Sequence, residues 1–449
     1  MIPFPLSEAV TACGGQFFGD AALLPQPVER VSIDSRSCGA GVLYVPILGQ
    51  VHDGHKFIPG AMEAGALCTL SDRPLPDGTP HILVSDTTEA LQRLAERYLA
   101  AHRIPVIGVT GSAGKTSTKE MLYTVLSRRF PAFKTPGNLN NQTGVPQAVF
   151  QLGPEHSLAI LELGTNHPGE IRALSRIIRP DICILTNIGV AHIEFFGSRE
   201  NILRGKAEML DYMQPGGTLI VNGDDDMLRT LDNAFRFGLG EDNDLRATAL
   251  LEQGLAGTAF TACYRGEQKD MFVPAPGRHM VYNALAAVAA GLTLGMTLSE
   301  LGEGVGAYRP SAGRMDIKTT PRFTILDDTY NANPASVMAA IDVLERAGGR
   351  RVCVLGDMLE LGPDSAEFHE VTGLYAANHG VELILCVGPN AGAICRGAAQ
   401  IRPRSALHFE TQEELHRVLP ELVQDGDTIL VKGSRGMRLE RTVALLMAL

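Results

Sequence analysis

Short apolar runs alternate with segments of helix length through the middle of the chain. The runs cover residues 104–110, 158–161, 182–185 and 218–221. Strands that are apolar on both faces are typical of a parallel sheet whose two faces are covered by helices. The segment 121–126 has apolar residues at helical spacing, which predicts one of these covering helices. We therefore expect a mainly parallel α/β domain over residues 85–312.

The same alternation restarts after a linker rich in Pro and Gly at 308–314. The later runs are 323–326, 351–355, 383–387 and 428–431. They predict a Rossmann-like domain over residues 313–449. Residues 1–84 contain shorter strand-like runs and turn signals, which predict a small α/β amino-terminal domain. At about 150 residues per domain, a chain of 449 residues fits these three α/β domains.

Composition narrows the class of protein. Hydrophobic residues make up 45% of the chain and charged residues 20%, which is typical of globular proteins. The net charge is −11 and no basic block is present, so a nucleic-acid partner is not expected. We expect no secretory signal, because the first residues have no positive charge before their apolar positions and no uninterrupted apolar core. We also expect no integral membrane segment, because the most apolar stretch, 284–298, is shorter than the roughly 20 residues that a bilayer needs. It predicts a buried helix.

The spacing of the cysteines indicates whether the protein resides in a reducing or an oxidising compartment. All eight are scattered, with no CxxC motif and no paired Cys/His spacing. This pattern predicts reduced thiols in a cytoplasmic protein and makes a structural zinc site improbable.

The strongest chemical signal is a glycine-rich turn between the run ending at 110 and the helix over 121–126. It consists of Gly111, Ser112, Ala113, Gly114, Lys115, Thr116 and Ser117. Backbone N–H groups and a helix N-terminus attract phosphate oxygens, a lysine neutralises β/γ-phosphate charge, and a Thr or Ser hydroxyl holds Mg²⁺. The spacing departs from the common G-x-x-x-x-G-K-[ST] motif, because Val109 stands five positions before Gly114. The strand before and the helix after still predict a P-loop ATPase domain.

Two further residues follow strands of the same predicted sheet. Glu162 comes after the run 158–161, and His192 comes after the run 182–185. Ligands bind at the carboxyl ends of strands in open α/β sheets, so we expect Glu162 to hold a second metal ion. His192 is the weaker metal candidate because Mg²⁺ prefers oxygen ligands.

Lys206 lies on the apolar side of a helical segment, four residues after Ile202. Lysines at such positions commonly extend their amine to water. The alternative is that the amine points inward and meets an acidic or anionic site.

Polar loops follow other strands. The loop 135–146 is dense in amides, which turn conformation alone explains, although Asn side chains also orient phosphate. Asp327 and Asp328 follow the run 323–326, and Asn333 before Pro334 is a good helix start. The loops 355–362 and 431–436 also leave strands with glycines and charges, and the second fits an anion clamp.

Together these motifs resemble the Mur ligase family, the ATP-dependent amide-forming enzymes of peptidoglycan precursor synthesis. The resemblance covers essentially the whole chain and rests on 34–36, 53–55, 110–116, 138–141, 144–146, Glu162, His192, Lys206, 277–283, Arg314 and Asp328. The stretches 328–336 and 355–362 resemble most specifically the members that add D-alanyl-D-alanine to UDP-N-acetylmuramoyl-tripeptide.

The resemblance implies an activity. The γ-phosphoryl group of ATP would move to the terminal carboxylate of the tripeptide, and the amine of the dipeptide would attack the resulting acyl phosphate. The products would be UDP-N-acetylmuramoyl-pentapeptide, ADP and phosphate. Domain 1–84 would bind the UDP substrate, domain 85–312 ATP, and domain 313–449 the incoming dipeptide. A monomer is the default expectation.

The resemblance also implies residue roles. The nucleotide would contact residues 111–117, Asn283, Arg314 and Asp328. Two Mg²⁺ ions would be held by Thr116, Glu162, His192 and a carbamylated Lys206. Substrate contacts would come from Ser35, Arg36, Asn138, Asn141, Tyr330, Asn331, Asn333, Lys432 and Arg435. The catalytic residues would be Lys115, Lys206, His192 and Asp328. Which amide of 138–141 meets phosphate stays open.

Two rival functions remain. Folylpolyglutamate synthetase shares the ATPase and final domains, but the 84-residue amino-terminal module counts against it, since the folate enzymes begin near the P-loop. A P-loop switch or motor would hydrolyse ATP without a second substrate, whereas a ligase turns over little ATP until its acceptor is present. The third residue of the tripeptide, lysine or diaminopimelate, is also left open.

Overall fold

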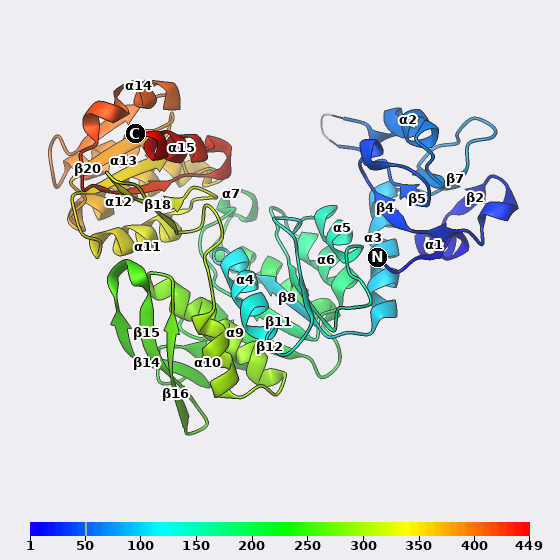
Figure 1. Cartoon of the computed structure of the whole chain (residues 1–449), viewed down its shortest axis with the longest axis horizontal. Helices are drawn as coiled ribbons and strands as arrows, with labels where there is room; N and C mark the ends of the chain where they lie inside the picture. Colours follow the sequence, from blue (N-terminus) through cyan, green and yellow to red (C-terminus); the bar gives the residue numbers. More distant parts are fainter. Residues whose placement is uncertain (50–51) are drawn as a thin grey trace. The chain divides into compact units, whose positions relative to one another are not determined.

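A computed structural model describes residues 1–49 and 52–449 (Figure 1). Three large sheets have five, nine and six strands, and β1 (Phe4–Pro5) pairs with β3 (Pro27–Val28). The chain divides into two compact units. The first contains residues 1–110, 129–183 and 207–217, and the second contains 111–128, 184–206 and 218–449. Each unit is described by itself.

The five-stranded sheet of the first unit has the order β2-β7-β6-β5-β4. Its strands are β2 (Gln16–Phe18), β4 (Arg30–Ser32), β5 (Val42–Tyr44), β6 (Cys68–Ser71) and β7 (His81–Leu83). All neighbouring strands are parallel except β2 and β7. The helices are α1 (Leu6–Cys13), α2 (Ile58–Glu63) and α3 (Thr87–His102). This is the small α/β domain predicted from the sequence.

Three parallel strands of the central sheet also belong to the first unit, namely β8 (Val106–Thr110), β10 (Leu158–Glu162) and β9 (Ala132–Lys134). β10 pairs with both of the others. Every residue of β8 and β10 is buried, which explains why these runs are apolar without alternation. The helices α5 (Gly144–Val149) and α6 (Glu170–Ile178) follow β9 and β10 in sequence. β11 (Ile182–Leu185) is equally buried.

The second unit begins with α4 (Lys115–Leu126) and continues with α7 (Ile193–Phe196) and α8 (Arg199–Ala207). Its central strands are β12 (Thr218–Asn222), β13 (Ala234–Gly238), β14 (Leu245–Glu252), β15 (Thr258–Tyr264) and β16 (Glu267–Val273). β12, β13 and β14 are parallel, whereas β15 and β16 pair in antiparallel fashion. The mainly parallel sheet is thus confirmed, and the antiparallel edge was not predicted.

The predicted buried helix over 284–298 begins and ends earlier in the structure. α9 (Arg278–Thr293) is buried along most of its length, and its chain turns at Gly295, where φ is 78°. α10 (Leu298–Gly306) then begins with a capping box formed by Thr297 and Glu300, which satisfies N–H groups at the helix start. No helix of the described residues is long and apolar enough to cross a membrane.

The six-stranded sheet has the order β17-β18-β22-β19-β20-β21. Its strands are β17 (Asp316–Thr319), β18 (Thr324–Asp328), β19 (Arg351–Gly356), β20 (Leu383–Val387), β21 (Ala406–Phe409) and β22 (Thr428–Lys432). Its helices are α11 (Pro334–Glu345), α12 (Ser365–Asn378), α13 (Gly392–Ala399), α14 (Gln412–Leu422) and α15 (Glu440–Ala448). Only β17 is antiparallel to its neighbour.

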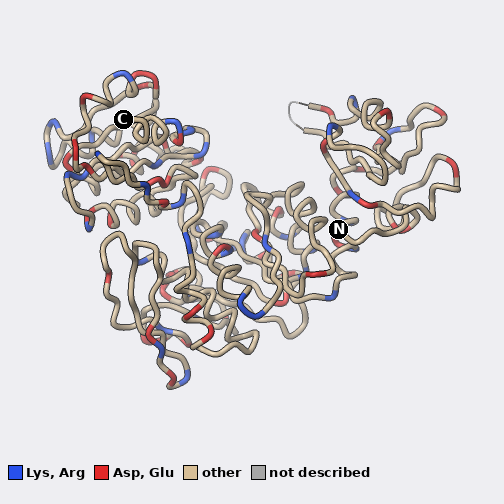
Figure 2. The backbone as a smooth tube through the Cα atoms, viewed as in Figure 1, with Lys and Arg blue, Asp and Glu red and all other residues tan. Residues whose placement is uncertain are grey.

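Two apolar clusters cover the two faces of this sheet. Leu355 and Leu430 belong to one cluster, whereas their chain neighbours Val354 and Val431 belong to the other. Successive side chains of a strand point to opposite faces, so both faces are buried. This confirms the predicted Rossmann-like domain. Figure 2 shows acidic and basic residues mixed along the whole chain.

Candidate active site

The glycine-rich turn needs its glycines. Gly111 has a φ of 154°, and a Cβ added there would lie 1.9 Å from the Oγ1 of Thr186. Gly114 has a φ of 78° and stands immediately before α4. A side chain at either position would be strained, because residues other than glycine rarely adopt such positive φ angles. The backbone of this turn therefore follows a path that few sequences permit.

Residues directly after β11 hold the turn in place. The N–H of Ala113 donates to the side-chain oxygen of Asn187 over 2.9 Å, and the Asn187 amide donates back to the Ala113 carbonyl over 3.0 Å. The hydroxyl of Thr186 donates to the same carbonyl over 2.6 Å. Sequence reasoning missed these anchors, although their position after an apolar run was a signal.

The turn leaves polar groups without protein partners. The hydroxyl of Ser112 is buried and has no hydrogen-bond partner within residues 1–49 and 52–449. The N-cap of α4 is Gly114, which has no side chain that could cap the first N–H groups of the helix. Such groups fit the oxygens of a bound phosphate chain, which also gains from the positive end of the helix dipole. The amine of Lys115 donates to the Gly111 carbonyl over 2.9 Å and so lies over the turn.

Two predicted nucleotide residues meet this turn and its helix, and the predicted substrate residue Tyr330 contacts one of them. The guanidinium of Arg314 donates to the Thr116 hydroxyl over 2.8 Å. The hydroxyl of Thr118 donates to the side-chain oxygen of Asn283 over 3.1 Å. Arg314 also stacks over the ring of Tyr330, with 3.9 Å between the guanidinium carbon and the ring centre. The linker before β17 therefore places a cation, Arg314, beside the glycine-rich turn.

Asp328 and Lys432 form a buried ion pair. The parallel pairing of β18 with β22 places them side by side, and the amine lies 2.6 Å from the carboxylate. The Lys432 amine also donates to the Asn331 carbonyl over 2.9 Å. Arg435 lies near the same residues, with its guanidinium carbon 5.7 Å from the centre of the Tyr330 ring. These residues form a positively charged group at the carboxyl ends of two strands.

The structure gives Asn333 a local role. Its side chain accepts from the N–H of Ser336 over 2.9 Å, and the Ser336 hydroxyl completes a capping box at the start of α11. This agrees with the helix start that the Asn-Pro pair indicates.

His192 pairs with Glu360, which sequence reasoning did not select. The Nδ1 of His192 lies 2.6 Å from a carboxylate oxygen of Glu360, within the 355–362 loop. His192 also has a φ of 63°, an uncommon value for a residue other than glycine. Histidines that bind a metal through one nitrogen usually place the other against a carboxylate or carbonyl. Within the described residues, the contact with Glu360 is close but lacks hydrogen-bond geometry, and it leaves Nε2 as the nitrogen for a metal ion.

The Lys206 side chain points inward and does not extend its amine to water. The side chain is 1% exposed. Burial lowers the pKa of its amine well below the usual value for lysine, and the positive charge of Lys115 lowers it further. Such an amine is easily deprotonated, and a neutral amine is the form that reacts as a nucleophile.

Glu162 belongs to the first unit and is 1% exposed. The amide of Asn140 donates to its carboxylate over 2.8 Å, and its backbone N–H donates to the Thr135 hydroxyl over 2.9 Å. Asn140 thus bonds to Glu162, the predicted metal ligand, whereas the substrate contacts predicted from the sequence are Asn138 and Asn141. The side chain of Asn141 accepts from the N–H of Gly144 over 2.8 Å, a bond within its own loop.

The carboxylate of Asp34 organises the predicted UDP-binding turn. It accepts from the backbone N–H of Arg36 over 3.0 Å and caps the short helical turn that starts at Ser35. The Arg36 guanidinium also donates to both oxygens of Asp34 over 2.9 and 2.8 Å. These hydrogen bonds hold the pKa of Asp34 below its usual value. The Arg36 side chain is 88% exposed and so remains accessible to a ligand.

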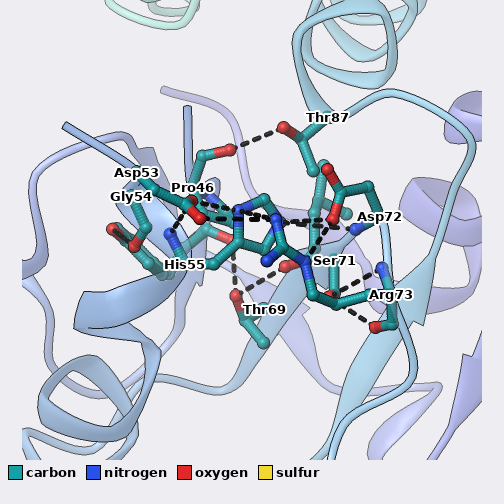
Figure 3. A network of polar contacts seen from close by, with 11 residues as sticks. Pro46, Asp53, Gly54, His55, Thr69, Ser71, Asp72, Arg73 and Thr87 are labelled. Carbon is teal, nitrogen blue, oxygen red and sulfur yellow. Dashed lines mark hydrogen bonds and ion pairs between the residues drawn. The ribbon is translucent and has the colours of Figure 1, made fainter. Parts of the chain in front are cut away.

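A charged network lies elsewhere in the same domain (Figure 3). His55 is buried, with its two ring nitrogens 2.8 Å from Asp53 and 3.2 Å from Asp72. Arg73 bonds to Asp72 over 2.8 Å and approaches Asp53 at 3.4 Å. The Ser71 hydroxyl donates to the Arg73 carbonyl over 2.6 Å. Each charged group therefore has an oppositely charged or polar neighbour within the network, which ties the 53–57 turn to the end of β6.

The comparisons with known proteins agree with this geometry. The sequence matches models of the Mur ligase family catalytic domain over 27–99, the Mur ligase middle domain over 109–291, and the Mur ligase glutamate ligase domain over 313–435. The UDP-N-acetylmuramoyl-tripeptide--D-alanyl-D-alanine ligase of Bacillus subtilis (strain 168) is 37% identical over 428 residues, covering 93% of this chain and 92% of that protein. The chain belongs to the Mur ligase family. The Escherichia coli (strain K12) protein of the same name is 34% identical and covers 99% of both chains.

Solved structures resemble this Mur ligase over its full length. MurF from Acinetobacter baumannii has a TM-score of 0.95, 33% identity, and coverage of 100% of both chains. MurF from Thermotoga maritima in complex with ADP has a TM-score of 0.85 and 29% identity, covering 94% of this chain and 97% of that one. A folylpolyglutamate synthase from Mycobacterium tuberculosis has a TM-score of 0.64 at 15% identity, covering 80% of this chain and 94% of that one, and shares the fold.

Proposed function

We propose that this chain joins D-alanyl-D-alanine to UDP-N-acetylmuramoyl-tripeptide, using ATP and forming an acyl phosphate on the tripeptide carboxylate. The products are UDP-N-acetylmuramoyl-pentapeptide, ADP and phosphate. The observation that carries the proposal is similarity over 93% of the chain to a ligase of this name. The phosphate turn 111–117, with its buried and unpartnered Ser112 hydroxyl, supports ATP as the phosphoryl donor.

Phosphoryl transfer depends mainly on positioning and on neutralising charge. In the proposed reaction, Lys115 and Arg314 place positive charge beside the phosphate chain, while Asn283 and Asp328 contact the nucleotide. The backbone N–H groups of the turn bind phosphate oxygens. Because Arg314 donates to Thr116, that arginine would position the hydroxyl while it faces the nucleotide.

The donor set also fits Mg²⁺, which would neutralise the transferring phosphoryl group when bound. Thr116 would provide a hydroxyl oxygen, and Glu162 would provide a carboxylate that Asn140 orients. His192 would be the third ligand, with the Glu360 carboxylate close to its Nδ1. Oxygen ligands agree with the preference of Mg²⁺, so we place Glu162 and Thr116 ahead of His192.

Lys206 would enter this site as a carbamate. Its amine is buried and its pKa is well below the usual value, chiefly through burial. A neutral amine adds to carbon dioxide, and loss of a proton leaves a carboxylate at the end of the side chain. This converts a cation that burial disfavours into an oxygen ligand for a cation.

The dipeptide would bind beside the carboxyl ends of β18 and β22. Lys432 and Arg435 supply positive charge for its carboxylate, and Tyr330, Asn331 and Asn333 surround the same position. The dipeptide amine attacks the acyl carbon, and its proton passes to an aspartate or to the acyl phosphate. Ser35 and Arg36 would bind the UDP substrate. In this proposal, domains 1–84, 85–312 and 313–449 bind UDP substrate, ATP and dipeptide within a cytoplasmic monomer.

The test is ADP release by the full chain with ATP and Mg²⁺. UDP-N-acetylmuramoyl-tripeptide and D-alanyl-D-alanine are added singly and then together, and the products are identified by mass spectrometry. ADP and pentapeptide should appear only with both substrates. Running tripeptides with lysine and with diaminopimelate in parallel identifies the preferred third residue. ADP release that is indifferent to both substrates would contradict the proposal and favour an ATP-driven switch.

A further inference from the structure

A large cavity in the first unit lies among residues that the proposed ligase reaction does not use. Its volume is about 790 Å³, and it is bordered by α1, α3 and α6. Its charged lining consists of Arg93, Arg97, Arg176, Arg179, Glu8 and Glu96. Four guanidinium groups around one cavity are unexpected in a chain whose net charge is −11, and they point to an anionic ligand.

Two of these arginines form ion pairs with glutamates at the cavity wall or beside it. Arg93 lies 2.6 Å from Glu89, and Arg97 lies 3.1 Å from Glu8. Such partly exposed pairs leave little free positive charge for a ligand. These two arginines therefore shape the wall of the cavity.

The other two arginines have unused donors. Arg176 approaches Glu96 only at 3.8 Å, and its Nε is buried without a hydrogen-bond partner in the described chain. Within residues 1–49 and 52–449, Arg179 has no ion-pair partner. A buried N–H without an acceptor is unfavourable, so an oxyanion that accepts from Arg176 would remove this cost. Guanidinium groups match phosphate and carboxylate oxygens in a planar, two-point geometry.

A smaller, ring-lined cavity adjoins the first. Its volume is about 240 Å³, and it shares Glu8 and Arg97 with the larger cavity. Tyr98 and His102 line it, with ring centres 4.5 Å apart. The Nε2 of His102 is buried without a hydrogen-bond partner in the described residues, while its Nδ1 lies 3.0 Å from the Tyr98 carbonyl. This cavity thus offers aromatic surface and one unused polar atom.

We propose that the two cavities together bind a small phosphate monoester of a ring compound. The phosphate would accept hydrogen bonds from Arg176 and Arg179, and the ring would pack against Tyr98 and His102. Aromatic surface with few placed polar groups is typical of small-molecule sites, and the larger cavity falls within the usual range of roughly 300–1,000 Å³. The site is separate from the residues that we assign to ATP, metal and dipeptide.

The probe is 4-fluorophenyl phosphate. Its binding to the full chain is measured by fluorine NMR in a titration. We expect saturable binding to the unmodified protein. The paired substitutions Arg176→Gln and Arg179→Asn should weaken it at least tenfold, since asparagine tolerates the positive φ of 42° at position 179. The control is Arg172→Gln on the same helix, because Arg172 pairs with Asp211 at 2.7 Å and does not line the cavity. It should leave binding unchanged.

Two further measurements separate the parts of the site. Ala101 lines the smaller cavity, so the bulky side chain of Ala101→Trp should weaken binding of 4-fluorophenyl phosphate. Inorganic phosphate should still displace the remaining bound probe. Saturating ADP with Mg²⁺ should not displace the probe. Absence of saturable binding, equal weakening by Arg172→Gln, or displacement by ADP would each overturn the proposal. None of these outcomes depends on ligase activity, so a failure here leaves the proposed ligase function standing.

Discussion

The phosphate turn 111–117 and the charged network around His55 use polar residues in opposite ways. In the network, each polar side chain has a partner close by, as with His55 between Asp53 and Asp72. In the phosphate turn, the Ser112 hydroxyl is buried with no partner in the described residues. Burying a polar group without a partner costs free energy. Unfilled donors therefore distinguish a ligand site from a network that stabilises the fold.

The largest expected effect comes from Gly111→Ala. The new methyl group would lie 1.9 Å from the Thr186 hydroxyl, so the turn must move. A displacement of this kind costs on the order of 100-fold in rate, and we expect at least that loss in ligase kcat/KM. The control is Gly266→Ala, because Gly266 also has a positive φ of 85° but nothing within 4 Å of an added Cβ. Equal activity loss in both variants would show that backbone strain alone explains the effect.

Lys206→Met should separate activity from stability. The folded protein lowers the pKa of Lys206, chiefly by burial, so below the ordinary lysine pKa the unfolded chain binds more protons than the folded one. Stability of the unmodified protein therefore rises with pH through that window. Methionine removes this cost, and we expect a variant that is more stable at neutral pH.

The measurement is urea unfolding in metal-free, bicarbonate-free buffer at neutral and at alkaline pH. The stability advantage of Lys206→Met should shrink as the pH approaches the ordinary lysine pKa. In a separate assay with ATP, Mg²⁺ and both substrates, the variant should have lost ligase activity at both pH values. Full activity in the variant would contradict a carbamate role. A variant that is less stable at neutral pH would contradict the sign of the pKa shift.

His55→Ala tests the network from the opposite side. Removing the ring leaves Asp53 and Asp72 without the group between them, and we expect the free energy of unfolding to fall by about 1–3 kcal/mol. At temperatures where the variant is folded, kcat should change less than threefold. Urea denaturation and the ligase assay check this together. Lost activity with unchanged stability would instead make His55 part of the reaction.

The smallest effect on folding is expected from Arg36→Gln. The Arg36 side chain is 88% exposed, and exposed ion pairs contribute little to stability, so unfolding should be unchanged within error. If Arg36 binds the UDP substrate, KM for that substrate should rise by about tenfold, the effect of losing one charge-assisted hydrogen bond. Arg36→Lys, which keeps the charge, should retain part of the affinity. An unchanged KM in Arg36→Gln would remove this residue from the substrate site.

Local patterns made the phosphate turn predictable. Strand, glycines, Lys-Thr and helix follow one another within a short segment, and the fully buried strands β8 and β10 appear in the sequence as apolar runs. The antiparallel strand β15 alternates buried and partly buried residues, so it lacks that signal. The three-domain α/β class therefore followed from the sequence, whereas the antiparallel edge of the central sheet did not.

Partners distant in sequence were not predictable. Asn187 bonds to Ala113 across 74 positions, and Glu360 meets His192 only because the fold brings two loops together. Within the loop 138–141, spacing could not show that Asn140 is the residue that reaches Glu162. Chemistry carried by one local segment is visible in the sequence, whereas chemistry assembled from several loops needs the structure.

The most direct test of the contrast between the two regions pairs Ser112→Ala with Ser71→Ala. For each variant, the free energy of unfolding without ligand and the affinity for ADP with Mg²⁺ are measured. Ser112 has an unpartnered hydroxyl, so its removal should stabilise the free protein and weaken ADP binding. The Ser71 hydroxyl bonds to the Arg73 backbone over 2.6 and 3.2 Å, so its removal should destabilise the protein and leave ADP binding unchanged. A destabilised Ser112→Ala variant with unchanged ADP affinity would contradict the account.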